Sequence, residues 1–129
     1  IRSNRSEAGL KPQHLKGIEA VARLCNANIS GFTEGSTKIE FCPGELVHDH
    51  LRIDIGTAGS IGLVFQCLML PAIQTDMPLE FEVTGGTDVS WSPSTTYFRE
   101  VYCNIIKKMG IDVEADIQRY GFYPAGGGR

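Results

Sequence analysis

The stretch Leu51-Arg-Ile-Asp-Ile-Gly-Thr-Ala-Gly-Ser60, with the apolar run that follows it, decides the fold of this chain. Apolar and charged residues alternate from Leu51 to Ile55, and this period of two predicts a half-buried strand. The residues from Ile61 to Leu70 are apolar almost all round, which predicts a buried central helix from about Gly59 to Ala72. Leu79–Thr84 alternates again and reads as a second strand. The sequence therefore predicts a strand–helix–strand core.

The same periodicities outline the elements on either side of this core. We expect helices over Pro12–Cys25 and from Ser92-Pro93 to Met109, and strands over Asn28–Thr33, Thr37–Phe41 and Ile111–Ile117. The later helix is expected to turn four side chains inward: Tyr97, Val101, Ile105 and Met109. His48 and His50 are expected in a polar loop ahead of the strand at Leu51.

Two parts of this layout have a similar order of secondary-structure elements. Helix 12–25, two strands and the Pro-Gly pair at 43–44 resemble helix 93–109, a strand, a turn and the Phe-Tyr-Pro-Ala-Gly segment at 122–126. The implied unit is β-α-β-α-β-β. We therefore predict an α+β (α/β repeat) fold with about one and a half units in part of a single domain. Residues 1–47 would be the second half of one unit, and residues 48–129 most of the next.

Composition limits the class of protein. The chain has 129 residues, 42% of them hydrophobic and 21% charged, with a net charge of −3, which is ordinary for a soluble globular protein. Its basic residues concentrate in residues 1–24, so a nucleic-acid partner along the whole surface is not expected, whereas a local phosphate site is.

The cysteines and apolar runs indicate the compartment. The four cysteines lie far apart and form no C-x-x-C pair, a pattern that favours a reducing cytoplasm over a disulfide framework. No signal peptide is visible, and the longest apolar run is about half of the ~20 residues that a membrane span needs. We expect a cytoplasmic protein without a membrane partner.

Anion-binding residue types crowd the beginning of the chain. We expect Arg2 and Arg5 in an extended segment, and Gln13 and His14 in the first turn of the helix that Pro12 opens. Guanidinium groups bind phosphate through two parallel hydrogen bonds, and a helix N-terminus adds free N–H groups. The alternative is an ordinary solvated basic surface.

Gln66 is a strongly polar side chain in a predicted buried helix. A buried amide needs hydrogen-bond partners, so Gln66 either bonds to neighbouring backbone or faces a ligand crevice. The glycines of residues 56–62 would bring N–H groups close to an anion or allow close packing of helix on strand. Trp91, Pro93 and Tyr97 would form an apolar slot for a planar base, or belong to a surface loop with a packed Trp.

His48 and His50 raise the question of a metal site. Two histidines in a loop lack a visible third ligand beyond Asp49 or Asp54, so we predict no metal site there. The residue spacing supports no Ser–His–Asp or Cys–His catalytic arrangement.

Five segments, taken in order, resemble the RNA 3′-terminal phosphate cyclase family. They are Ile1-Arg-Ser-Asn-Arg5, Gly9-Leu-Lys-Pro-Gln-His14, Gly56-Thr-Ala-Gly-Ser60 with Gln66, Gly85-Gly-Thr-Asp88, and Gly121-Phe-Tyr-Pro-Ala-Gly-Gly-Gly128. The resemblance runs from the first residue to the last without a register break.

The resemblance implies an ATP-dependent enzyme of the ligase class that converts an RNA 3′-phosphate into a 2′,3′-cyclic phosphate. A histidine is adenylylated by ATP, AMP passes to the RNA 3′-phosphate, and the vicinal 2′-OH expels it. By motif, Arg2, Arg5, Gln13 and His14 would bind the RNA phosphate. Gln66, Pro93 and Tyr97 would contact the nucleotide. ATP and a divalent metal, Mg²⁺ or Mn²⁺, are the implied cofactors.

Parts of the family pattern have no match here. Two features of the family fall outside these residues: a Gly-rich segment that helps to hold the metal, and the histidine that acts as the nucleophile. No catalytic residue is therefore expected within the chain. The 129-residue chain alone is therefore expected to be inactive, and an unpaired sheet edge is expected to favour association, with a homo-oligomer as one form. The alternative is a non-catalytic, cyclase-like RNA-binding protein that acts in ribosome assembly.

Overall fold

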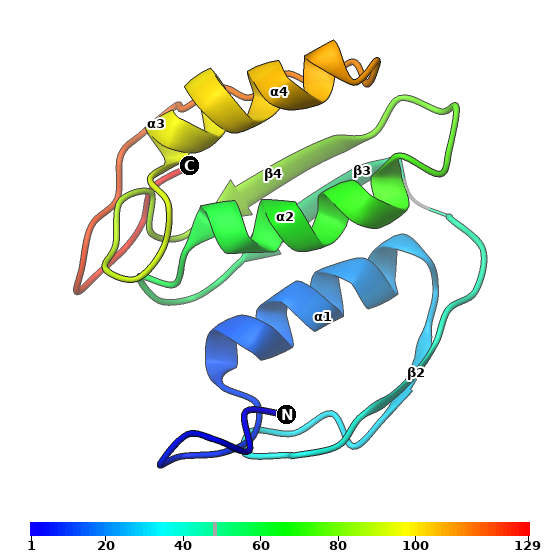
Figure 1. Cartoon of the computed structure of the whole chain (residues 1–129), viewed down its shortest axis with the longest axis vertical. Helices are drawn as coiled ribbons and strands as arrows, with labels where there is room; N and C mark the ends of the chain where they lie inside the picture. The colour runs from blue at the N-terminus through cyan, green and yellow to red at the C-terminus, as the bar shows by residue number, and fades with distance from the viewer. Residues whose placement is uncertain (48) are drawn as a thin grey trace.

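The computed structural model describes residues 1–47 and 49–129, and it confirms a mixed α+β fold (Figure 1). The elements, in chain order, are α1 (Pro12–Leu24), β1 (Asn28–Ser30), β2 (Glu40–Cys42), β3 (His50–Asp54), α2 (Ile61–Ala72), β4 (Glu80–Thr84), α3 (Thr95–Tyr97), the π-helical turn η1 (Phe98–Tyr102) and α4 (Cys103–Lys108). His48 lies outside the described residues, whereas His50 begins β3 rather than lying in the predicted loop.

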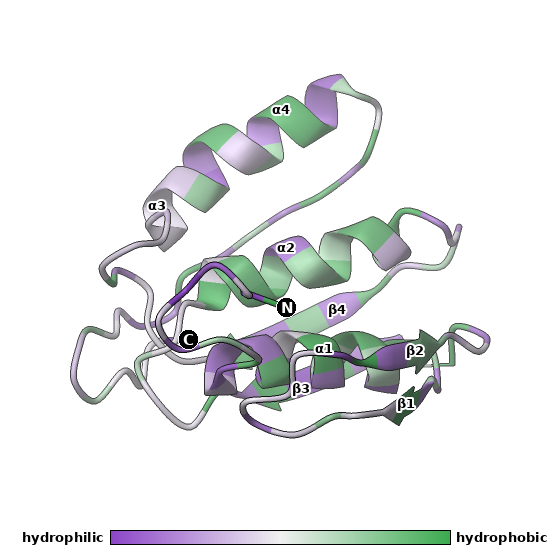
Figure 2. Ribbon diagram, turned by 60° about the horizontal axis from the view of Figure 1, so that its bottom comes forward, coloured by the Kyte–Doolittle hydropathy of each residue, from purple (hydrophilic) through white to green (hydrophobic). Residues whose placement is uncertain are grey.

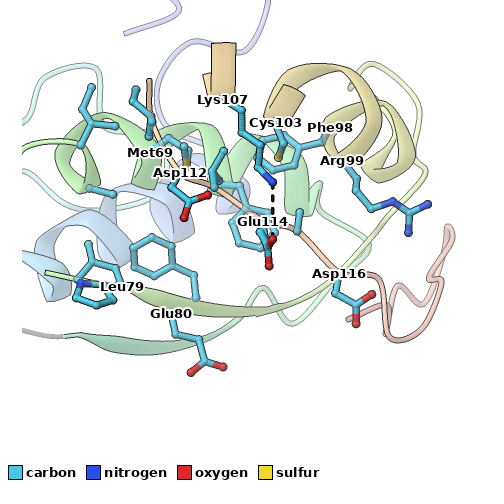
Figure 3. Close-up of a pocket in the computed structure, with 18 of the residues that line it drawn as sticks. Met69, Leu79, Glu80, Phe98, Arg99, Cys103, Lys107, Asp112, Glu114 and Asp116 are labelled. Carbon is cyan, nitrogen blue, oxygen red and sulfur yellow. Dashed lines mark ion pairs between the residues drawn. The ribbon is translucent and has the colours of Figure 1, made fainter. Parts of the chain in front are cut away.

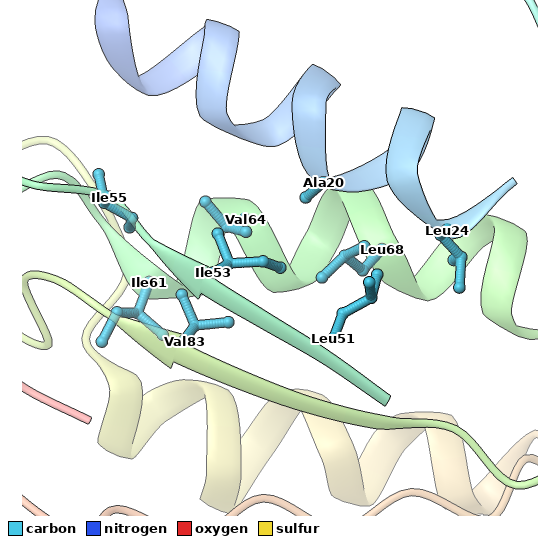
Figure 4. Packing of buried hydrophobic residues seen from close by; sticks show 9 residues of the cluster. All are labelled: Ala20, Leu24, Leu51, Ile53, Ile55, Ile61, Val64, Leu68 and Val83. Atoms are coloured by element: carbon cyan, nitrogen blue, oxygen red, sulfur yellow. The ribbon is translucent and has the colours of Figure 1, made fainter. Parts of the chain in front are cut away.

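The β3–α2–β4 unit confirms the predicted strand–helix–strand core. β3 and β4 pair in parallel, with Leu51 opposite Phe81 and Ile53 opposite Val83. Parallel neighbours require a crossover connection, which α2 supplies. Buried side chains from β3, β4, α1 and α2 meet in one cluster (Figure 4): Ala20, Leu24, Leu51, Ile53, Ile55, Ile61, Val64, Leu68 and Val83.

Helix α1 packs against α2 through a small residue. A side chain at Gly17 would lie 3.2 Å from the Cys67 sulfur, so glycine lets the two helices approach closely. Pro12 stands at the start of α1, as predicted, because its fixed φ and missing N–H suit the first helical turn. The end of α1 is anchored by Leu24, which is fully buried.

The second helix is not buried all round. α2 is largely hydrophobic (Figure 2), but Cys67 and Leu70 are exposed, Leu70 by 70%. Ser60 caps the helix by accepting a hydrogen bond from the Leu63 N–H at 3.3 Å. Within the described residues α1, the β3–β4 sheet and Phe98 of η1 pack against α2, and Leu70 lies on a part of the helix that they leave open.

The third helical segment differs from its prediction in both start and phase. Ser94, not Ser92, caps it, and its first helical residue is Thr95. The four side chains expected inward, Tyr97, Val101, Ile105 and Met109, are between 36% and 70% exposed. Phe98 is buried instead, stacked between Phe65 at 5.4 Å and Tyr102 at 4.8 Å between ring centroids. The stack of Phe98 on Phe65 and Tyr102 therefore determines which face of this segment points inward.

Three predicted strands are shortened or absent. β1 and β2 pair over three residues each. The segment after β1 pairs elsewhere, because Ser36 O accepts from Leu10 N and Gly35 N donates to Leu10 O. Residues 111–117 form no strand: their exposure alternates as in an extended chain, but no partner strand pairs with them among the described residues.

The longest helix that the structure describes is α1, with 13 residues. None of the described helices combines the length and apolar character that a membrane crossing requires.

Candidate functional site

Loops from three parts of the chain meet at the carboxyl ends of β3 and β4. Gly86 N donates to Gly59 O at 2.8 Å, and Ile61 N donates to Gly86 O at 3.0 Å. Gly85 and Gly128 exchange two backbone hydrogen bonds, of 3.0 and 2.7 Å. The amino-terminal ends of α1, α2 and α3 lie on this same side of the molecule (Figure 1). Ligands of open α/β sheets bind outside the carboxyl ends of parallel strands, so this edge is the candidate site.

The glycines at this edge allow loop to pack on loop. A side chain at Gly86 would overlap the Ala58 carbonyl, and one at Gly126 would come within 2.7 Å of Thr57 O. The N–H of Gly56 already donates to Asp54 Oδ1 at 2.8 Å, and that of Gly59 donates to Thr57 Oγ1 at 3.2 Å. Close packing accounts for Gly59, where a Cβ would lie 2.7 Å from Ile55 Cγ2. It does not account for Gly56, which has a φ of +74° and open space around it, or for Gly62, where a Cβ would make an ordinary contact of 3.6 Å.

The segment that holds Arg2 and Arg5 is folded back and not extended, contrary to the prediction. Arg2 adopts a φ of +53°, and its Nη1 donates to the carbonyls of Glu7 at 3.1 Å and Gly9 at 3.2 Å. Arg5 N donates to Arg2 O, and the Arg5 side chain is exposed, with no ion-pair partner among the described residues. Arg2 therefore fastens the loop, and the Arg5 guanidinium is available to a ligand.

Gln13 and His14 lie where α1 begins. Gln13 is exposed, and its Cβ would lie 3.7 Å from a Cβ at Gly59. Gln13, one of the residues predicted to bind the RNA phosphate, therefore lies next to the loop that leads into α2. His14 Nδ1 accepts a hydrogen bond from Lys11 N at 2.9 Å and so caps the helix. The pKa of His14 is lowered, first by burial and second by the charge of Arg2. A neutral His14 with Nδ1 as acceptor carries its proton on Nε2, which is then free to donate.

Stability should depend on the protonation of His14. Because the folded state lowers its pKa below the ordinary value of 6.5, the unfolded chain binds the proton more tightly. The free energy of unfolding is therefore expected to fall as the pH drops through 6.5, where protonation also removes the acceptor of the Lys11 N–H. His14→Gln keeps an acceptor without a titrating group, so it should reduce this pH dependence. Urea unfolding of both proteins at about pH 7.5 and about pH 5.5 measures the difference. An identical pH dependence would contradict this assignment.

Gln66 and Pro93 lie on the same side of α2. A Cβ at Gly62 would lie 3.6 Å from the Pro93 carbonyl oxygen, and Gln66 follows Gly62 by four residues, so the two share a helix face. Gln66 is half-buried and makes no side-chain hydrogen bond within the described residues, unlike the predicted core amide bonded to neighbouring backbone. Pro93 is exposed, and Tyr97, in the turn that follows it, is 52% exposed.

Trp91 does not pack as either sequence interpretation requires. Its φ is +68° and its side chain is fully exposed, so it is neither packed in a surface loop nor part of a closed slot. The positive φ turns the chain ahead of Ser94 and delays the start of α3.

Two buried threonines were missed by the sequence analysis. Thr87 Oγ1 donates to Gly121 O at 3.0 Å and accepts from Gly121 N at 3.0 Å. Thr95 Oγ1 donates to Thr87 O at 2.9 Å. Together they hold the Gly121–Gly128 segment against β4. The only sequence signal was the position of Thr87 in the Gly-Gly-Thr-Asp break, because its partner is far away in the chain.

No metal cluster is visible at this edge. Within residues 1–47 and 49–129, no three His, Cys, Asp or Glu side chains lie close enough together to hold a metal ion. His50 Nδ1 lies instead 3.6 Å from Glu80 Oε2, across the two strands. The predicted site residues thus provide guanidinium, amide, imidazole and aromatic groups, and the nearby carboxylate of Asp54 accepts a hydrogen bond from Gly56 N.

Known proteins are similar to this chain over almost its whole length. A family model described as RNA 3′-terminal phosphate cyclase matches residues 1–129. Similar proteins with the same name include those of Thermococcus kodakarensis (52% identical over 99% of this chain), Pyrococcus furiosus (48% over 99%) and Archaeoglobus fulgidus (46% over 99%). The chain spans only 37%, 37% and 39% of the length of these three relatives. Since the family match covers every residue, the chain belongs to the RNA 3′-terminal phosphate cyclase family.

Proposed function

We propose that this chain is the part of an ATP-dependent RNA 3′-terminal phosphate cyclase that binds the RNA terminal phosphate and the nucleotide. The complete enzyme, of the ligase class, would convert an RNA 3′-phosphate into a 2′,3′-cyclic phosphate through enzyme–AMP and RNA–adenylate intermediates. AMP would be transferred to the 3′-phosphate and then expelled when the vicinal 2′-OH attacks. The observation that carries this proposal is the exposed Arg5 guanidinium, which has no ion-pair partner within residues 1–47 and 49–129, in a chain whose family match is complete.

The residues proposed to bind the RNA 3′-phosphate would attract it by charge and orient it by hydrogen bonds. Arg5 would bind the terminal phosphate directly, since its planar fork suits two phosphate oxygens. Arg2 would contribute charge while it holds the loop in place. Gln13 and neutral His14 would add neutral donors at the amino end of α1, where the helix dipole favours an anion.

The residues proposed to contact the nucleotide lie on α2, in the segment before α3 and on α3 itself. The half-buried amide of Gln66 would hydrogen-bond the adenylate, and Pro93 and Tyr97 would cover the base. The shared face of Gln66 and Pro93 supports this assignment. The described residues do not fit the Mg²⁺ or Mn²⁺ that the family likeness implies, because no group of acidic or imidazole ligands converges here. We infer a cytoplasmic location from the four cysteines, which are all free.

The test of this proposal is a comparison of RNA ends. Arg5→Ala should weaken binding of a 3′-phosphorylated oligoribonucleotide about tenfold or more, because a hydrogen bond to a charged group contributes roughly 1.5–3 kcal/mol. Binding of the 3′-hydroxyl form should barely change. Fluorescence anisotropy with the two labelled RNAs measures both affinities.

Two variants serve as controls for Arg5→Ala. Lys108→Ala removes the same charge from an exposed position at the end of α4 and should leave both affinities unchanged. Arg2→Ala should lower the unfolding midpoint as well as the affinity, because it removes the contacts that fasten the loop. Equal losses for both RNA ends on Arg5→Ala would show a general RNA surface and reject the phosphate site.

A further inference from the structure

Three aromatic side chains are exposed together late in the chain. Tyr120, Phe122 and Tyr123, here called the aromatic surface, are between 49% and 83% exposed. The rings of Tyr120 and Phe122 are nearly parallel, with 12° between their planes and 6.3 Å between their centroids. Aromatic rings carry a large apolar area that folding ordinarily buries, so a group of exposed rings indicates a binding surface.

The backbone under these rings is held in place. Gly121 lies between the two parallel rings in the sequence, and both its N–H and its carbonyl bond to Thr87 Oγ1 at 3.0 Å. The hydroxyl of Tyr120 lies 3.3 Å from Thr96 Oγ1, within hydrogen-bond distance. A surface that is ordered before binding loses little conformational entropy when a ligand arrives.

The aromatic surface lies beside the candidate site. Gly126 N donates to Phe122 O at 2.7 Å and closes the turn that carries the rings. A Cβ at Gly126 would lie 2.7 Å from Thr57 O, and the same loop contacts Gln13 through Gly59. Figure 1 shows the turn on the side of the molecule where α1 and α2 begin. One loop therefore separates the rings from the residues proposed to bind the RNA 3′-phosphate.

The aromatic surface is open and does not belong to a cleft. A groove of about 1120 Å³ runs between β4 and the segment after Gly110 (Figure 3), and none of the three rings lines it. Small ligands bind in concave pockets that enclose most of their surface. An open row of rings suits a flexible polymer instead, because successive bases of a single strand can each lie on one ring.

A basic group accompanies the rings. Arg119 is exposed, and its Nε donates to Gly127 O at 2.7 Å. In the part of the chain that the structure describes, Arg119 forms no ion pair, so its terminal N–H groups are available to a phosphodiester. Aromatic rings together with guanidinium groups are typical of surfaces that bind single-stranded nucleic acid.

We propose that the aromatic surface stacks the bases of the nucleotides that precede the 3′-phosphorylated nucleotide of the RNA. The inference rests on the proposed function, which places the terminal phosphate near the start of α1. Stacking on a side chain requires an unpaired base, so the preferred substrate is an RNA whose 3′ end is single-stranded. Every base has a π face, so the surface binds such ends without selecting their sequence.

The test compares RNAs with and without these bases. One ligand is a single-stranded, 3′-phosphorylated oligoribonucleotide. The other has the same length and charge, but abasic residues at the two positions before the terminal nucleotide. Phe122→Ala and Tyr123→Ala should each weaken binding of the intact RNA about tenfold and leave binding of the abasic RNA unchanged, as measured by fluorescence anisotropy.

Three further variants serve as controls. Phe122→Tyr keeps a ring and should bind the intact RNA as the parent does. Phe122→Leu keeps an apolar side chain without a ring and should bind like Phe122→Ala. Met109→Ala removes an exposed apolar side chain beyond the end of α4 and should change neither affinity. Equal losses for intact and abasic RNA on Phe122→Ala would show that the ring supports the fold and not a base, and would overturn the proposal.

The preference for a 3′-phosphate over a 3′-hydroxyl separates this inference from the proposed function. Phe122→Ala should leave that preference unchanged, because the ring stacks on a base and not on the terminal phosphate. If the parent prefers the phosphate but neither Phe122→Ala nor Tyr123→Ala weakens binding of the intact RNA, the stacking surface is wrong and the phosphate site stands. If the parent shows no preference for the phosphate, the proposed function fails, whereas a loss confined to the intact RNA still supports stacking.

Discussion

Replacement of Gly86 by alanine is expected to lower the free energy of unfolding by about 3 kcal/mol. A Cβ at this position would overlap the Ala58 carbonyl and lie 2.5 Å from Val89 Cγ1. The backbone has little freedom to move away, because Gly86 N donates to Gly59 O at 2.8 Å and its carbonyl accepts from Ile61 N at 3.0 Å. Relief of the overlap therefore requires the loop before α2 to separate from the end of β4. Urea unfolding measures the loss.

Gly62→Ala is the matched control for Gly86→Ala. A Cβ at Gly62 would make an ordinary contact of 3.6 Å with the Pro93 carbonyl, and the position is helical. Alanine is favoured over glycine in a helix, so this change should be neutral or stabilising by up to roughly 0.5–1 kcal/mol. If both alanine variants unfold at the same urea concentration as the parent, the close packing of the loops is not a source of stability.

Leu68→Ala is expected to cost about 3–5 kcal/mol, the second large effect. Leu68 is 0% exposed and lies in the cluster between α1 and the β3–β4 sheet, where Leu24 and Leu51 also have almost no exposure. Truncation removes transfer energy and leaves a cavity that a close-packed core fills only in part. Thermal and urea unfolding give the loss.

Leu70→Ala makes the same chemical change two residues away on α2. Leu70 is 70% exposed, so its truncation should cost less than about 0.5 kcal/mol. The comparison tests the orientation of α2 directly. Similar losses at both positions would show that α2 is covered on all sides.

The sequence predicted those elements whose pattern is decided locally. The alternation of Leu51–Ile55 and the helical start at Pro12 depend on neighbours in the chain, and both elements formed as predicted. The phase of the third helical segment depended on a distant ring, Phe65, and was wrong. The strand predicted over residues 111–117 has the right side-chain alternation, but no strand in residues 1–47 and 49–129 pairs with it, and a strand needs a partner.

For the candidate site, too, the sequence predicted what depends on local motifs and missed what depends on tertiary packing. Arg5, Gln13, His14, Gln66, Pro93 and Tyr97 were selected by motif, and their ligand roles stay predictions. The turn at Arg2 and the contact between Gln13 and Gly59 arise from tertiary packing, which periodicity does not reveal. The pairing of Thr87 with Gly121 spans 34 residues and was equally invisible in the sequence.

The pairing of Thr87 with Gly121 also bears on the order in which the molecule folds. The β3–α2–β4 unit joins elements that are consecutive in the chain, and it provides most of the residues of the buried cluster. Thr87 and Gly121 are 34 residues apart, a similar separation, but the Gly121–Gly128 segment contributes no residue to the buried cluster and bonds to groups that the end of β4 must first present. We therefore expect the sheet and α2 to assemble first and the edge at the carboxyl ends of β3 and β4 to be completed last. The same edge should open first in the native state, leaving the core intact.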